Sequence, residues 1–193
     1  MGKIESSKDL IMLMLHAKGK SGVDCEPIKG KTRLMKMVFL FDKEIRKQFN
    51  MEKAVDKIAI PDFVAHDFGP FSANVYEDLE FLVNAGFVTA TMSAESEKVE
   101  KEEYDYWLAT SKEDPPDFNG VTEFSLTDVG RDFVKDELKP NFSDVQRNIL
   151  DKFKAKCTGI PLTTLLKYVY TKYPDMTGKS KIKTKILGND TKN

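Results

Sequence analysis

The chain has 193 residues, of which 40% are hydrophobic and 32% charged, and its formal net charge is −1. This length suits one substantial domain or two small ones, and the apolar fraction can fill a core. The near-zero net charge excludes a simple polybasic or polyacidic protein. No apolar run approaches the ~18 residues of a membrane span, and the first residues do not form a signal peptide, so we expect a cytoplasmic protein.

Two helices are predicted in the first fifty residues. Apolar residues recur at helical spacing over 7–18, where Ser6 or Ser7 can cap the first turn and Gly19 can end the helix. Over 31–49 the three- and four-residue spacing is stronger and marks one buried face. The residues on that face are Leu34, Met37, Val38, Phe41 and Ile45. We therefore expect the 31–49 helix to be central to the fold.

A strand–turn–helix unit is predicted in the middle of the chain. Residues 58–67 have an extended pattern, and Gly69-Pro70 gives a tight turn that aims the following helix. Ser72 is a good N-cap for that helix. Gly86 provides the left-handed residue that ends it.

A hairpin is predicted after this helix. A strand over 87–92 is followed by an exposed polar and acidic run over 93–103 and a second strand over 104–109. A further short strand then leads into a helix that Thr127 can cap.

Two more helices, over 142–156 and 161–173, complete the pattern. The order of elements is typical of a mainly helical, winged-helix-like α+β domain with a small antiparallel sheet and extra C-terminal helices. We assign residues 1–175 to this single domain. Because the chain after Pro174 is Lys-rich and poor in apolar residues, we assign 176–193 to a flexible basic tail.

Charge is segregated along the chain. Residues 28–47 contain seven basic and two acidic residues, whereas 93–117 contain nine acidic and three basic ones. Four basic residues cluster at the start of the predicted 31–49 helix, where the positive end of the helix dipole suits a phosphate or another anion. These candidate nucleic-acid-binding or anion-binding residues are Lys29, Lys31, Arg33 and Lys36. The alternative is an ordinary solvated helix face.

No sequence pattern indicates catalysis. His66 and Asp67 are adjacent, but neighbouring residues on a strand point to opposite faces, so we expect His66 to be structural. Cys25 and Cys157 have no second Cys or His at metal-ligand spacing. The sequence also lacks a P-loop, a dinucleotide-binding glycine pattern and a nucleophile elbow. We expect no metal, no cofactor and no catalytic residue.

Two segments carry a family resemblance. GKTRLMKMVFLFDKEI has a basic helix start, and FVAHDFGPFSANVYEDLEFLVNAGFV has an aromatic residue, Gly-Pro-Phe-Ser, a helix and a glycine stop. Together with FSLTDVG, they resemble the YwgA-like and Panacea-domain proteins, which include SocA-type antitoxins. The resemblance implies a phage- or defence-associated intracellular protein with no known catalytic site. It also implies motif positions at Lys31, Leu34, Lys36, Met37, His66, Phe68, Gly69, Pro70, Phe71, Ser72 and Gly86.

Three functional hypotheses follow. The preferred one is a non-enzymatic interaction module, antitoxin-like or adaptor, which contacts a toxin or a regulated protein and is compatible with a homodimer. The second is a winged-helix nucleic-acid-binding transcriptional regulator that uses the basic helix start. The third is a hydrolase or nuclease assembled from scattered acids such as Asp42, Glu44 and Asp67.

Overall fold

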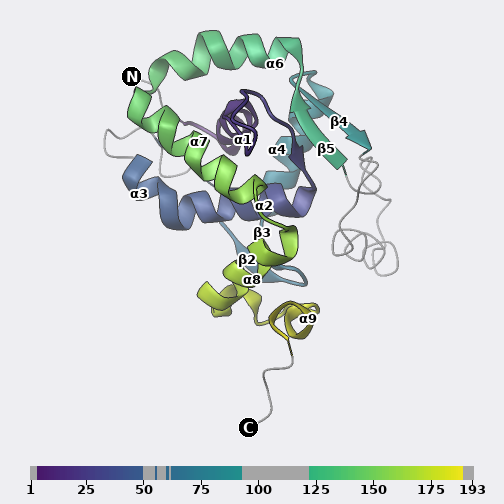
Figure 1. The fold of residues 1–193 in the computed structure, drawn as a ribbon. Coiled ribbons are helices and arrows are strands. Elements are labelled where there is room, and N and C mark those ends of the chain that lie inside the picture. Colours follow the sequence, from purple (N-terminus) through teal and green to yellow (C-terminus); the bar gives the residue numbers. More distant parts are fainter. Residues whose placement is uncertain (1–3, 50–54, 56–59, 61, 93–121, 189–193) are drawn as a thin grey trace.

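Helix α1 (Ser7–His16) lies in the middle of the larger part of the computed structural model, with helices and the main sheet packed around it (Figure 1). The structure describes residues 4–49, 55, 60, 62–92 and 122–188. The helix begins with a capping box, in which the Ser6 amide donates to Asp9 Oδ2 at 3.0 Å. Six consecutive apolar residues from Leu10 to Leu15 are buried, as expected for a helix that is covered on all sides. Within the described ranges no helix is long and apolar enough to span a bilayer.

The predicted 31–49 helix is confirmed as a nearly continuous rod made of three pieces. These are α2 (Lys31–Leu40), a π-helical turn η1 (Phe41–Ile45) and α3 (Arg46–Phe49). In the π turn the Arg46 amide donates to the Phe41 carbonyl, five residues back instead of four. Within this turn Phe41 is fully buried, whereas Glu44 and Ile45 are half-buried.

The main sheet is small and antiparallel, so the α+β class is confirmed. Its strand order is β1 (Ile28–Lys29), β5 (Thr122–Leu126) and β4 (Val88–Met92), with Val88 opposite Leu126 and Ile28 opposite Phe124. These four apolar residues are buried, which fixes the register because a one-residue slip would expose all of them. The acidic run 93–103 and the predicted strand 104–109 lie outside the described residues.

The second sheet is a hairpin of β2 (Val64–His66) and β3 (Gly69–Phe71). Because His66 pairs with Gly69, the two turn residues are Asp67 and Phe68. The turn thus lies two residues before the predicted position, and Gly69 and Pro70 belong to β3. Helix α4 (Ala73–Asn84) follows, with Ser72 at its N-cap position.

The glycine stop of α4 is confirmed. Gly86 has φ of 77°, its amide donates to the Val83 carbonyl at 3.0 Å, and the Phe87 amide donates to the Leu82 carbonyl at 2.9 Å. This is the Schellman pattern, which satisfies two of the last carbonyls of the helix.

The C-terminal half adds further helices over the outside of α1 and α2 (Figure 1). They are α6 (Asp128–Phe133), the π turn η3 (Val134–Leu138), the 3₁₀ turn η4 (Lys139–Asn141), α7 (Asp144–Thr158) and α8 (Leu162–Lys172). Thr127 caps α6 as predicted, since its Oγ1 accepts from the Gly130 amide at 3.0 Å.

A flexible tail was predicted over 176–193, but the described part of this segment, which ends at residue 188, is folded. It forms η5 (Pro174–Thr177) and α9 (Lys183–Leu187), packed on α8 and on the β2–β3 hairpin. The Lys181 amide donates to the Asp67 carbonyl at 2.9 Å, and Lys181 Nζ pairs with the Asp67 carboxylate at 2.9 Å. Composition suggested fraying, but these contacts attach the segment to the hairpin turn.

Candidate functional site

Arg33, one of the four predicted anion-binding residues, is a structural anchor inside the protein. Its side chain is buried, and Nη1 donates to the Cys157 carbonyl at 2.6 Å and to the Ile160 carbonyl at 2.9 Å. The Cys157 carbonyl belongs to the last turn of α7, where carbonyls have no intrahelical donor. Arg33 therefore caps α7 from the first turn of α2, and its guanidinium is buried against these carbonyls.

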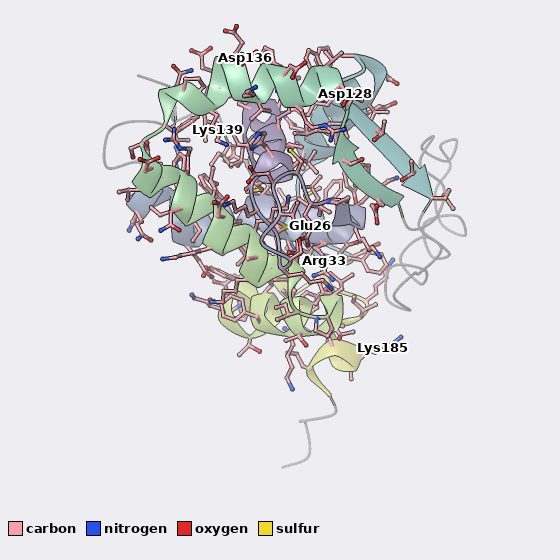
Figure 2. All side chains as sticks on the ribbon, turned by 45° about the horizontal axis from the view of Figure 1, so that its top comes forward. Glu26, Arg33, Asp128, Asp136, Lys139 and Lys185 are labelled. Atoms are coloured by element: carbon pink, nitrogen blue, oxygen red, sulfur yellow. The ribbon has the colours of Figure 1, made fainter. Side chains whose placement is uncertain are left out.

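Lys36, the second of the four, is buried as well. Its Nζ donates to the Pro70 carbonyl at 2.9 Å and so attaches α2 to the β2–β3 hairpin. Lys29 lies at the surface, 3.9 Å from Glu123 across the β1–β5 pair, and Lys31 is half-buried at the start of α2. The four residues thus do not form one exposed patch. Figure 2 shows Arg33 in the middle of the molecule, whereas Lys185 lies at its outer edge, on α9.

The residues of the hairpin motif position the backbone. His66 is exposed and stacks on Phe71, with 4.8 Å between ring centroids. Gly69 has φ of 86°, and a Cβ at this position would lie 2.8 Å from the Tyr170 ring. Gly69 is therefore required both for its backbone conformation and for the close approach of α8.

A third buried cation was not predicted. Lys154 of α7 is fully buried and donates from Nζ to the carbonyls of Leu15 at 2.9 Å, Ala17 at 2.7 Å and Glu26 at 2.5 Å. Burial lowers the pKa of this lysine to about 8, although the neighbouring Glu26 carboxylate acts in the opposite direction. Lys154 caps α1 as Arg33 caps α7, because both cations donate hydrogen bonds to carbonyls at helix ends.

The two ends of α7 are tied to the two ends of the α2–η1–α3 rod. Gln146, in the first turn of α7, donates from Nε2 to the Phe49 carbonyl at 3.0 Å, and Arg33 joins the other ends. Between these anchors the helices leave a groove with a volume of about 500 Å³, which α8 bounds on a third side. This groove, referred to below as the α7 groove, is the candidate functional site.

The surface of the α7 groove is mainly apolar. Its apolar lining includes Leu40 and Ile45 from the rod, Ile149 and Phe153 from α7, and Leu165 from α8. Val145 lies at the rim of the groove, and 69% of its surface is exposed. A recess of this kind suits an apolar ligand surface better than it suits water.

The polar rim of the groove is asymmetric. Lys152 and Lys156 stand one helical turn apart on α7, and both are exposed. Across the described ranges no carboxylate lies within 4 Å of either amine. The rim therefore has positive charge available along the α7 side.

The carboxylate of Glu44 closes the groove near α8. It accepts from Tyr168 Oη and Tyr173 Oη at 2.9 Å, and Lys172 Nζ lies 3.1 Å from it. Burial, followed by the hydrogen bond to Glu44, raises the pKa of Tyr173 to about 12. Through its contacts with Lys172, Tyr168 and Tyr173, Glu44 holds α8 and the residue that follows it against the π turn.

Each of the scattered acids lies next to a cationic side chain. Asp42 pairs with Arg46 at 2.9 Å, Asp67 with Lys181, and Glu44 with Lys172. Among the residues that the structure describes, no cluster of three His, Cys, Asp or Glu could hold a metal ion.

The groove was not predicted from the sequence, although the apolar residues of α7 give one indication of it. Helix α7 carries Val145 and Ile149 beside its core-facing positions Leu150 and Cys157, which gives it more apolar surface than one buried stripe requires. The other walls come from residues far away in the chain, so no local pattern indicates them.

Comparisons with known proteins add no assignment to this geometry. No protein-family model matches the chain, and no curated protein matches it either. The resemblance to YwgA-like and Panacea-domain proteins therefore stays a prediction.

Proposed function

We propose that this chain is a non-enzymatic protein-interaction module, antitoxin-like or adaptor in role, that contacts its partner through the α7 groove. The observation that carries this proposal is the exposed apolar recess itself, held open between anchors at both of its ends. A preformed recess binds with little loss of conformational entropy in the protein, which favours specific association. The resemblance to antitoxin-containing families supports the same role in a phage- or defence-associated system.

Protein contact is favoured over nucleic-acid contact by the placement of charge. Arg33 and Lys36 are buried against carbonyls, so neither guanidinium nor amine is presented to a phosphate. Helix α4, which precedes β4, contains three carboxylates (Glu77, Asp78 and Glu80) and no Lys or Arg. A helix of this composition would repel a DNA backbone, because phosphate contacts depend on cationic side chains.

Site-specific photo-crosslinking in the native host tests this function. A photoreactive amino acid is placed at Val145 on the groove rim or, as a matched control, at Val129 of α6, which is 61% exposed and does not line the groove. We expect a discrete adduct from position 145 only. The protein in the adduct is then purified, and its affinity is measured for the full chain and for an Ile149→Asp variant.

The expected result is direct binding that the Ile149→Asp change weakens by at least roughly tenfold, because a carboxylate in the apolar lining costs desolvation energy. Equal crosslinking from positions 145 and 129, or pairwise binding that Ile149→Asp leaves unchanged, would overturn the proposal.

A further inference from the structure

We infer that the α7 groove takes an amphipathic α-helix of a partner protein, about three turns long, with acidic residues one turn apart that face Lys152 and Lys156. This inference rests on the proposed function and specifies the chemistry of the partner.

The dimensions of the groove fit a short helix. Along α7 the lining runs from Val145 to Cys157, which corresponds to about 18 Å at a rise of 1.5 Å per residue. The same length accommodates three turns of a partner helix. The walls are themselves helices, so their side chains form rows at three- and four-residue spacing, into which the ridges of another helix can pack.

The apolar lining indicates which face of the partner enters. Val145 and Ile149 lie one turn apart, and Ile45 faces them from the rod as part of the same recess. A helix with apolar residues at i, i+3, i+4 and i+7 would cover this surface, as in other helix-in-groove complexes. Covering Val145 would also remove an exposed apolar side chain from water.

The rim charges determine the sign of the partner's polar residues. Lys152 and Lys156 are four residues apart, so their amines project in the same direction from α7. Glu44, the acid at the rim, is already engaged by Lys172 and by Tyr168. Two acidic residues at i and i+4 of the partner therefore meet two cations that have no competing carboxylate within 4 Å in the described part of the chain. This complementarity favours an acidic helix over a basic one.

Fluorescence anisotropy with designed peptides tests the inference on the full chain. The probe is a labelled three-turn helical peptide with leucines at i, i+3, i+4 and i+7 and glutamates at two flanking positions one turn apart. A second peptide has lysines in place of the two glutamates, and a third has a central proline that prevents the helix. We expect saturable binding of the acidic helix and at least roughly tenfold weaker binding of the other two.

A charge swap gives the decisive comparison. The variant Lys152→Glu/Lys156→Glu is expected to lose the acidic peptide and to gain the lysine peptide, whereas Lys167→Glu, an exposed charge reversal on α8 outside the groove, changes neither. Equal binding of the acidic and lysine peptides would overturn the charge assignment.

Two further outcomes would overturn the inference as a whole. One is tight binding of the proline peptide, which would indicate an extended partner. The other is binding of decanoate in preference to every peptide, which would indicate an acyl ligand. Either result is compatible with a crosslinked protein partner at position 145, so the inference can fail while the proposed function stands.

Discussion

Lys36 donates from Nζ to the carbonyl of Pro70 at 2.9 Å, and this bond joins the two most distinctive segments of the sequence. The basic helix start and the Gly-Pro-Phe-Ser hairpin lie more than thirty positions apart, yet one buried amine connects them. The lysine is therefore part of the hairpin's support. Its ammonium group donates to a backbone carbonyl inside the protein.

The Lys36→Met variant is expected to destabilise the protein by about 1–3 kcal/mol, because the buried Pro70 carbonyl loses a donor. Urea denaturation measures the change in the free energy of unfolding. Lys47→Met, an exposed change on α3, serves as the control and is expected to stay within about 0.5 kcal/mol of the parent. Similar effects of the two substitutions would contradict the anchoring role of Lys36.

Gly69→Ala is expected to cost roughly 2–4 kcal/mol, because it combines a left-handed backbone with a Cβ that would lie 2.8 Å from the Tyr170 ring. Gly22→Ala separates the two causes. Gly22 has φ of 77°, and a Cβ there would have no atom of the described residues within 4 Å, so this change is expected to cost only about 1 kcal/mol.

Thermal denaturation of both alanine variants, alone and with Tyr170→Leu, measures the steric part. The double variant Gly69→Ala/Tyr170→Leu is expected to lose less stability than the sum of the two single changes, because the smaller leucine leaves room for the new methyl group. Strict additivity would show that α8 does not press on the hairpin.

Lys154 makes the stability of the protein depend on pH in the alkaline range. Folding lowers the pKa of its amine from 10.5 to about 8, so between these values the unfolded chain holds the proton more tightly. The contribution of Lys154 to stability therefore increases as the pH rises from about 8 toward 10.5, by up to about 3 kcal/mol, and is constant below about 8.

The measurement is the difference in the free energy of unfolding between the parent and Lys154→Met over this pH range. Methionine does not titrate, so the stability advantage of the parent is expected to grow with pH. At neutral pH the variant is expected to be less stable by about 3 kcal/mol, since three carbonyls lose their donor. A constant difference across the range would show that the amine titrates equally in both states.

Cys157, at the wall of the groove, is expected to be unreactive in the folded protein. Burial raises the pKa of its thiol to about 12, which leaves on the order of a thousand-fold less thiolate near pH 8 than in a free cysteine. Cys25 is only half-buried and is expected to label first with iodoacetamide. Mass spectrometry of the labelled peptides gives both rates, and urea-unfolded protein should label at both cysteines alike.

Duplex DNA is expected to show no retardation with the full chain in a mobility-shift assay at low salt. Two of the four candidate cations are buried, and α4 has acidic residues only among its charged positions. A shift that weakens steeply with added salt would instead support the regulator hypothesis. In that case, Lys29→Ala and Lys31→Ala would identify whether the junction between β1 and α2 carries the contact.

Helical periodicity was enough to predict the rod over 31–49, the glycine stop at Gly86 and the cap at Thr127, because each depends on residues close in the chain. The burial of Arg33 was not predictable in this way. A basic residue at a helix start has the same local sequence pattern whether its side chain donates to water, to a phosphate or to a distant carbonyl. The carbonyls that accept from Arg33 lie 124 residues away or more. The groove depends on equally distant segments.

The burial of Lys154 had a weaker local signal. Lys154 lies on the same helical face as Leu150 and Cys157, both of which are core residues. This spacing predicts that its side chain faces the core. Periodicity could identify a buried lysine there, but the three carbonyls that receive it come from the end of α1 and the loop that follows.

The anchors on α7 also have a consequence for biosynthesis. Lys154 donates to the carbonyl of Leu15 in α1, 139 positions earlier in the sequence. Arg33 donates to the carbonyl of Cys157, 124 positions later. Contacts this distant slow folding, since a long stretch of chain must close before they form. In a nascent chain whose α7 has not yet left the ribosome, the end of α1 and the Arg33 guanidinium do not have these hydrogen-bond partners. We therefore expect ribosome-bound intermediates to depend on chaperones until α7 has emerged, and products truncated before it to be degraded.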